Sequence, residues 1–109
     1  MTQHDEITEV AAQLEALGNE SRLSIFHLLV SAGDTGLPVG DILNTLSIAP
    51  STLTHHIQRL TAVGLVSQTR VGRKLMCRAN FATMNQVVSF LTRNCCSMEA
   101  DLQSEEAAA

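Results

Sequence analysis

The sequence APSTLTHHIQRLTAVGLV, residues 49–66, determines how the rest of the chain must be organised. Its apolar side chains recur at helical spacing and predict one buried stripe along a helix that Pro50 opens. The members of this stripe are Leu53, Ile57, Leu60 and Val63. Gly64 ends the helix, and the tight break Ser47-Ile48-Ala49 separates it from an earlier one. Two helices joined by so short a break are typical of a helix-turn-helix.

Helical periodicity extends toward the N-terminus. We expect a first helix that ends at Gly18, a second that Asn19 caps, and a short third that begins at Pro38. Their apolar positions are Val10, Leu14 and Leu17, then Leu23, Phe26, Leu29 and Val30, then Val39, Ile42, Leu43 and Leu46.

The period changes after Gly64. Residues 65–70 and 73–79 read as two strands joined by a turn at Val71-Gly72, and a last helix runs from Phe81 to about Cys96. The prediction is a mainly α fold with a β-hairpin wing, which is a winged helix-turn-helix over residues 1–96. Residues 97–109 read as an acidic, flexible tail.

Length and composition exclude several classes of protein. The chain has 109 residues, which indicates one domain, and 45% are hydrophobic, enough for a modest core. It has no apolar run of about 18 residues, and its acidic N-terminus does not resemble a signal peptide. Three cysteines do not form a disulfide framework, so we expect a cytoplasmic protein. With only three Phe and no Trp or Tyr, base stacking on exposed rings is not expected.

Charge is segregated along the sequence. All seven Lys and Arg residues fall within residues 22–93, whereas residues 1–21 and 94–109 carry only acidic charges. This predicts a basic face for a polyanion, with ordinary solvated surface as the alternative.

The helix over residues 50–63 is the expected recognition helix, which enters the major groove while the wing approaches the DNA backbone or the minor groove. Its polar side chains hydrogen-bond without a large apolar surface, and the wing adds cations around an exposed turn. The predicted DNA contacts are Ser51, Thr52, Thr54, His55, Gln58 and Arg59 on the helix, and Arg70, Arg73 and Lys74 on the wing. His56 diverges from His55 by about 100° and is expected to pack against the helix that precedes the break.

Cys95 and Cys96 are adjacent, and we call them the vicinal pair. Neighbouring Cα atoms are about 3.8 Å apart, closer than a disulfide prefers, whereas a soft thiophilic centre can bridge both sulfurs. A helix C-terminus followed by Glu99 and Asp101 disfavours the thiolate, so a ligand that displaces the protons suits the pair better than peroxide does. The alternative is that both are small residues packed at a dimer contact. Cys77 is expected in a buried strand position.

Two stretches of this sequence resemble the ArsR/SmtB repressors. Residues 14–25, LEALGNESRLSI, are similar to the family's opening, and residues 49–57 with AVGLV at 62–66 are similar to its recognition helix and the start of its wing. The resemblance covers residues 10–96. It implies a homodimer formed through the first and last helices, a pseudo-palindromic DNA operator, and release on sensing a metal, a metalloid or a reactive sulfur species.

Departures from the family pattern narrow the choice of inducer. Pro38 and Gly40 stand where many arsenic-responsive members carry cysteines, and the Asp and His pattern of zinc sensors is missing from the last helix. Residues 90–96, FLTRNCC, resemble the ending of a subgroup that responds to trivalent arsenic, including methylated forms. The resemblance therefore implies arsenite, methylarsenite or antimonite at Cys95 and Cys96. The rise of the last helix separates Cys95 from Cys77 within one subunit, so Cys77 is a further candidate ligand only across a dimer. DNA binding itself requires no cofactor.

Three alternatives stay open. The first is a repressor of the same fold that senses thiol redox state or persulfides, and the second is a winged-helix module with no ligand response that binds protein rather than DNA. The third is a thiol enzyme, such as a small arsenical-binding reductase. The sequence contains no phosphate-cradling glycine loop, no general base beside the cysteines and no cofactor fingerprint, so we expect no enzyme.

Overall fold

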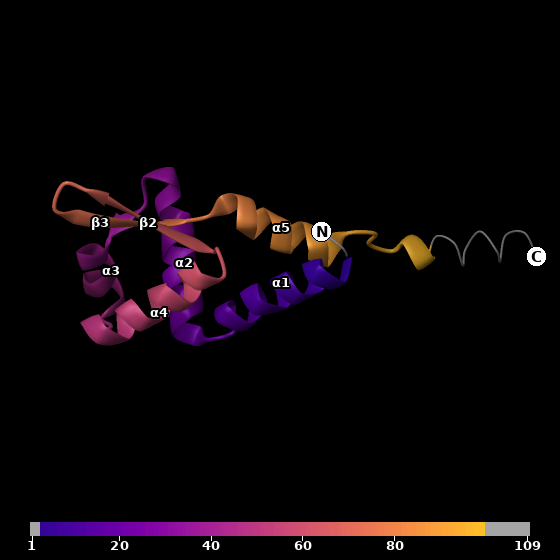
Figure 1. The fold of residues 1–109 in the computed structure, drawn as a ribbon, viewed down its shortest axis with the longest axis horizontal. Coiled ribbons are helices and arrows are strands. Elements are labelled where there is room, and N and C mark those ends of the chain that lie inside the picture. Colours follow the sequence, from indigo (N-terminus) through magenta and orange to yellow (C-terminus); the bar gives the residue numbers. More distant parts are fainter. Residues whose placement is uncertain (1–2, 100–109) are drawn as a thin grey trace, which may run out of the picture.

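The computed structural model describes residues 3–99, which form five α-helices, one 3-10 turn and a three-stranded sheet (Figure 1). In chain order the elements are α1 (Gln3–Leu17), α2 (Glu20–Ala32), η1 (Gly33–Thr35), β1 (Leu37–Pro38), α3 (Val39–Leu46), α4 (Pro50–Ala62), β2 (Val66–Val71), β3 (Lys74–Ala79) and α5 (Phe81–Thr92). The winged helix-turn-helix predicted from the sequence is confirmed. No helix within residues 3–99 is long and apolar enough to cross a membrane.

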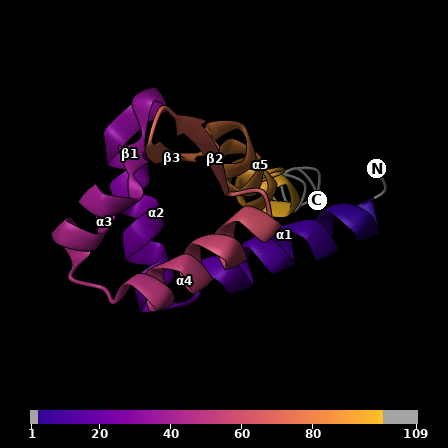
Figure 2. The ribbon, with the colours of Figure 1, turned by 60° about the vertical axis from the view of Figure 1, so that its left-hand side comes forward.

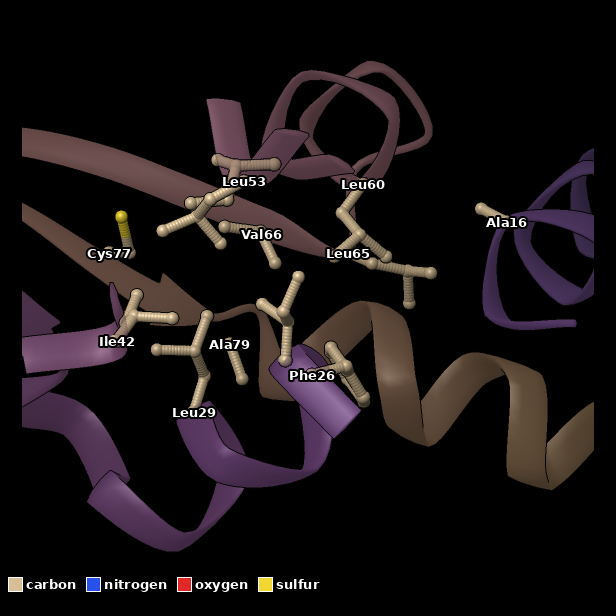
Figure 3. Close-up of a cluster of buried hydrophobic side chains, with 12 residues drawn as sticks. Ala16, Phe26, Leu29, Ile42, Leu53, Leu60, Leu65, Val66, Cys77 and Ala79 are labelled. Carbon is tan, nitrogen blue, oxygen red and sulfur yellow. The ribbon is translucent and has the colours of Figure 1, made fainter. Parts of the chain in front are cut away.

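The hydrophobic core lies between α2, α3, α4 and the sheet (Figure 3). Leu53, Ile57 and Leu60 of the stripe on α4 are buried, and Val63 packs at the margin of the core. Fully burying a side chain of this size contributes about 1.5–3 kcal/mol, so three such residues hold α4 firmly by one face. The opposite face of α4 is thereby directed to solvent.

The turn between α3 and α4 depends on local backbone conformation. Ser47 adopts the left-handed conformation (φ 53°, ψ 44°), and its N–H donates to the Leu43 carbonyl, which ends α3. Pro50 then opens α4 as predicted, with Ala49 in the N-cap position. Asn19 caps α2 as predicted, because its side chain accepts from the Arg22 N–H at 3.1 Å. Pro38, expected inside the first turn of α3, precedes that helix instead.

The wing is a hairpin that pairs Val66 with Ala79 at its base and Val71 with Lys74 at its tip. Its turn is Gly72-Arg73, one residue later than predicted, because Val71 still pairs in the ladder. A third strand, β1, pairs Leu37 with Cys77, and the sequence pattern did not predict it because it is only two residues long.

The exposed apolar residues differ from the prediction on the first two helices. Leu14 and Leu23, expected inside, are 39% and 51% exposed, whereas Gln13 and Ala16 of α1 are buried. On α1 the residues beside Leu14 face the core instead, because an amphipathic helix buries only the face that packs against another element. Ile7 is also exposed, at two turns from Leu14 along α1.

The last helix is shorter than predicted. α5 ends at Thr92, because Arg93 has an extended backbone (φ −60°, ψ 133°) and Asn94 and Cys96 have positive φ. Cys95 and Cys96 therefore lie in a turn after α5, not on the helix. Residues 97–99, expected to belong to a flexible tail, are helical, and the rest of that predicted tail, residues 100–109, lies outside the described residues.

Candidate nucleic-acid interface and thiol pair

The solvent-facing side of α4 presents most of the predicted DNA contacts. Ser51, Thr52, Thr54, His55 and Gln58 are all exposed. The first turn of α4 has no side-chain cap, so its leading N–H groups remain available to an anion such as a phosphate. The Thr54 hydroxyl donates to the Pro50 carbonyl at 3.0 Å, which directs its oxygen lone pairs outward as acceptors.

A groove of about 670 Å³ separates α4 from the wing. Thr54 and Gln58 line its helix side, and the wing contributes Arg70, Arg73 and Lys74. All three cations are exposed, and among residues 3–99 none of them forms an ion pair. Asp41 at the start of α3 also lines the groove, so three cations stand against one carboxylate. The groove therefore brings hydrogen-bonding side chains and an excess of positive charge to one face, which suits a phosphate backbone.

Arg59 was grouped with these contacts in the sequence but has a partner within the chain. Its Nη2 lies 2.9 Å from Oε1 of Glu15 on α1, in an ion pair whose side chains are 43% and 69% exposed. Arg59 does not line the groove between α4 and the wing.

The two neighbouring histidines face different surroundings. His55 is exposed, whereas His56 is half-buried with Nδ1 3.3 Å from Nη1 of Arg22. His56 thus contacts the start of α2 and not, as predicted, the helix before the break. Burial, followed by the charge of Arg22, lowers the pKa of His56. The neutral ring can accept a hydrogen bond from Arg22, and the protonated ring cannot.

The vicinal pair is exposed and its sulfur atoms face each other. The Sγ atoms of Cys95 and Cys96 are 3.2 Å apart, and both thiols are free. The contact with the Cys95 thiol, followed by slight desolvation, raises the pKa of Cys96. A raised pKa makes this thiol a weak nucleophile at neutral pH. A thiophilic metalloid can still bind it, because the metalloid takes the place of the proton.

Cys77 lies elsewhere in the fold. It is fully buried on β3, where Nε2 of Gln68 donates to its sulfur at 3.4 Å, and burial raises its pKa. Figure 1 shows β3 at the left of the molecule and the end of α5 well to its right. Within residues 3–99 no three His, Cys, Asp or Glu side chains gather as a metal site. A site made of all three cysteines is therefore not formed within this described chain.

An ion pair next to the vicinal pair joins the two ends of the described chain. Arg93 binds Glu6 of α1 through two hydrogen bonds, of 2.6 and 3.2 Å, and its guanidinium lies 5.7 Å from the Phe90 ring centre. The hydrogen bond to Arg93 lowers the pKa of Glu6. Sequence reasoning missed both Glu6 and Glu15, because their partners are 87 and 44 residues away and no local pattern links them.

Comparisons with known proteins agree with this geometry. Residues 17–69 match a helix-turn-helix domain family. An ArsR-like transcriptional regulator from Rhodococcus sp. RHA1 is 26% identical, with a TM-score of 0.77 and coverage of 94% of each chain. A protein whose structure is described as a "possible transcriptional regulator for arsenical resistance" is 25% identical, with a TM-score of 0.62 over 82% of this chain and 94% of that one.

A further structure supports the fold alone. The homodimeric winged helix-turn-helix DNA-binding domain of Mb0332 from Mycobacterium bovis is 23% identical, with a TM-score of 0.64 over 87% of this chain and 90% of that one. The sequence has no match among curated proteins. The domain and the fold are those of DNA-binding regulators and not of enzymes.

Proposed function

We propose that this DNA-binding transcriptional regulator of the ArsR type is a homodimeric repressor, released from its operator by trivalent arsenic at Cys95 and Cys96. The observation that carries the inducer is the exposed pair of free thiols with sulfurs 3.2 Å apart. Arsenite, methylarsenite and antimonite are the candidate ligands.

DNA binding follows from the exposed face of α4 and the groove beside it. Ser51, Thr52, Thr54, His55 and Gln58 are placed to reach base edges and phosphates, and the wing supplies Arg70, Arg73 and Lys74. At least half of the hydrogen bonds to DNA are expected to reach its sugar-phosphate backbone. The affinity for DNA should therefore fall steeply as the salt concentration rises.

A dimer is supported by apolar side chains that the single chain leaves uncovered. Ile7 and Leu14 of α1 and Val88 and Leu91 of α5 are 39–60% exposed, on the two helices that extend away from the core (Figure 1). Pairing these helices with a second copy would cover the four side chains, and a stable interface needs roughly 800 Å² on each partner. The dimer would also present two recognition helices, which must lie about 34 Å apart to enter successive major grooves.

The number of available ligands favours trivalent arsenic or antimony over zinc. Structural zinc takes four protein ligands in a tetrahedron, and within residues 3–99 no three His, Cys, Asp or Glu side chains gather as a metal site. The two exposed thiols face each other and can supply two ligands to trivalent arsenic or antimony, which bind three ligands in a pyramid.

Binding needs no oxidant. Each of the two thiols gives its proton to one hydroxide on arsenic, so two As–S bonds replace two As–O bonds and two waters leave. With methylarsenite, the methyl group completes the three-coordinate centre. Disulfide formation at the same pair would instead remove two electrons and require an oxidant.

The test is a titration of the reduced protein with arsenite, methylarsenite, antimonite and zinc, read as release of a DNA duplex selected by the protein from a random pool. Cys95→Ser with Cys96→Ser is expected to bind the duplex normally and to ignore the arsenicals. The matched control is Cys77→Ser, which removes a buried thiol and should respond as the wild type does.

Release of DNA from the double variant by arsenicals would contradict the proposed site. Release of the wild type by hydrogen peroxide or persulfide alone, with sulfur–sulfur adducts detected by mass spectrometry, would instead favour the redox-sensing alternative.

A further inference from the structure

Contacts from helix α4 to α1 and α2 lie outside the groove beside the wing. They are made by His56 and Arg59, three residues apart on one side of the helix, and by the backbone carbonyl of Val63 directly after it. Each contacts α1 or the start of α2. We call this set of contacts the α1–α4 joint, and Figure 2 shows the two helices side by side.

Three polar contacts make up the joint. Arg59 pairs with Glu15 at 2.9 Å, and Nε2 of Gln13 donates to the Val63 carbonyl at 3.2 Å. Arg22 forms the third, since its Nη1 lies 3.3 Å from His56 while its Nε donates to the carbonyl of Ala16 on α1 at 2.7 Å. Helix α4 and the residue after it are thus joined to α1 directly at two points and through Arg22 of α2 at a third.

Gln13 makes a directional contact that apolar packing alone would not provide. Gln13 is only 2% exposed, and its Oε1 is buried without a hydrogen-bond partner in the described chain. An unsatisfied buried acceptor costs about 1–3 kcal/mol, which an apolar side chain of similar size would avoid. What an apolar side chain could not do is donate to the carbonyl at the C-terminal end of α4, which has no partner within the helix.

The buried stripe already holds α4 by one face, and directional contacts restrict its orientation further. Dispersion and burial are non-directional, but a hydrogen bond weakens steeply when its angle departs from linear. The joint therefore restricts how α4 can rotate relative to α1, and α1 carries part of the apolar surface assigned above to the dimer.

We propose that Gln13, Glu15 and Arg22 are positioning residues that set the orientation of the recognition helix relative to α1. Arg59 then belongs to this joint and does not contact phosphate. The proposal rests on the proposed function only in taking α4 as the element that enters DNA.

The test compares binding of one DNA probe by variants of the exposed ion pair. The probe is a duplex of about 30 base pairs selected from a random pool by the wild type, long enough for two half-sites one helical turn apart. Glu15→Gln and Arg59→Gln are each expected to weaken binding about two- to fivefold, the factor to which an exposed ion pair converts. The double variant should be no weaker than either single variant, and the swap of Glu15→Arg with Arg59→Glu should restore binding.

The dependence of affinity on salt separates positioning from phosphate contact. If Arg59 acts only in the joint, its loss leaves the slope of the logarithm of the association constant against log salt unchanged. Loss of a phosphate contact instead makes this negative slope shallower by about 0.9 per phosphate. Arg70→Gln serves as the positive control for a lowered slope. Glu9→Gln removes the same charge from α1 at an exposed position with no ion pair in the described chain, and should leave binding unchanged.

Two results would overturn the proposal. In the first, Arg59→Gln lowers the slope by about 0.9 or more while Glu15→Gln leaves or tightens binding, which would make Arg59 a phosphate contact. In the second, the wild type selects no duplex at all, which would also remove the DNA-binding role of α4. Thermal melting of every variant verifies that altered binding does not reflect unfolding.

Discussion

Replacing Arg70, Arg73 and Lys74 together with Gln should flatten the salt dependence of DNA binding. The three side chains are exposed on the wing, line the groove beside α4 and form no ion pair within residues 3–99, so each is available to a phosphate. At about 0.9 per phosphate, a dimer that uses all three on both wings would lose about 5 from the slope, and one contact per wing would account for about 2.

The magnitude can be measured by fluorescence anisotropy of a labelled duplex between 50 and 200 mM salt. Over that fourfold range, a slope reduced by 2 to 5 makes the loss of affinity about tenfold to a thousandfold smaller than in the wild type. Arg93→Gln is the matched control, because it removes a cation that is paired with Glu6 and follows the end of α5, which Figure 1 shows apart from the wing. An unchanged slope in the triple variant would refute the assignment of the wing to the DNA backbone.

Three further predictions concern individual residues. A chromogenic thiol reagent should label the two thiols of the vicinal pair in the native protein, and Cys77 only after unfolding, because burial both covers Cys77 and raises its pKa. Rapid labelling of three thiols in the native protein would contradict this. Gly36→Ala should destabilise the fold by about 3 kcal/mol or more in urea unfolding, since Gly36 has a φ of 74° and an added Cβ would overlap the Cys77 carbonyl; a loss under 1 kcal/mol would contradict this. His56 has a lowered pKa, so its neutral form is favoured on folding; its contribution is present above its ordinary pKa near 6.5 and is lost as the pH falls through the lower folded value. Melting temperatures from pH 8 to 5 should therefore fall less in His56→Gln than in the wild type, and parallel curves would exclude the effect.

Local patterns in the sequence were sufficient to predict the elements that carry the proposed DNA interface. The stripe on α4 is a repeat of 3.6 residues, Asn19 and Pro50 act on their own backbone neighbours, and the two strands of the wing flank a local turn at Gly72. These signals lie within a few residues of each other and depend on covalent geometry and burial, so they can be recognised from the sequence before the fold is known. The adjacency of Cys95 and Cys96 can be recognised for the same reason.

Contacts between distant segments could not be read in this way. The pairing of Glu15 with Arg59 and of Glu6 with Arg93 depends on where α1 crosses α4 and α5, and the exposure of Leu14 depends on which helix face meets the core. The end of α5 at Thr92 is a further case, since the apolar spacing continued to Leu91 and nothing in it marked the turn that exposes the thiols. Periodicity specifies which residues share a face, but the packing of whole helices selects the face that is buried and the charges that meet. For this reason Arg59, grouped with the DNA contacts by its position on α4, is held by a carboxylate 44 residues away.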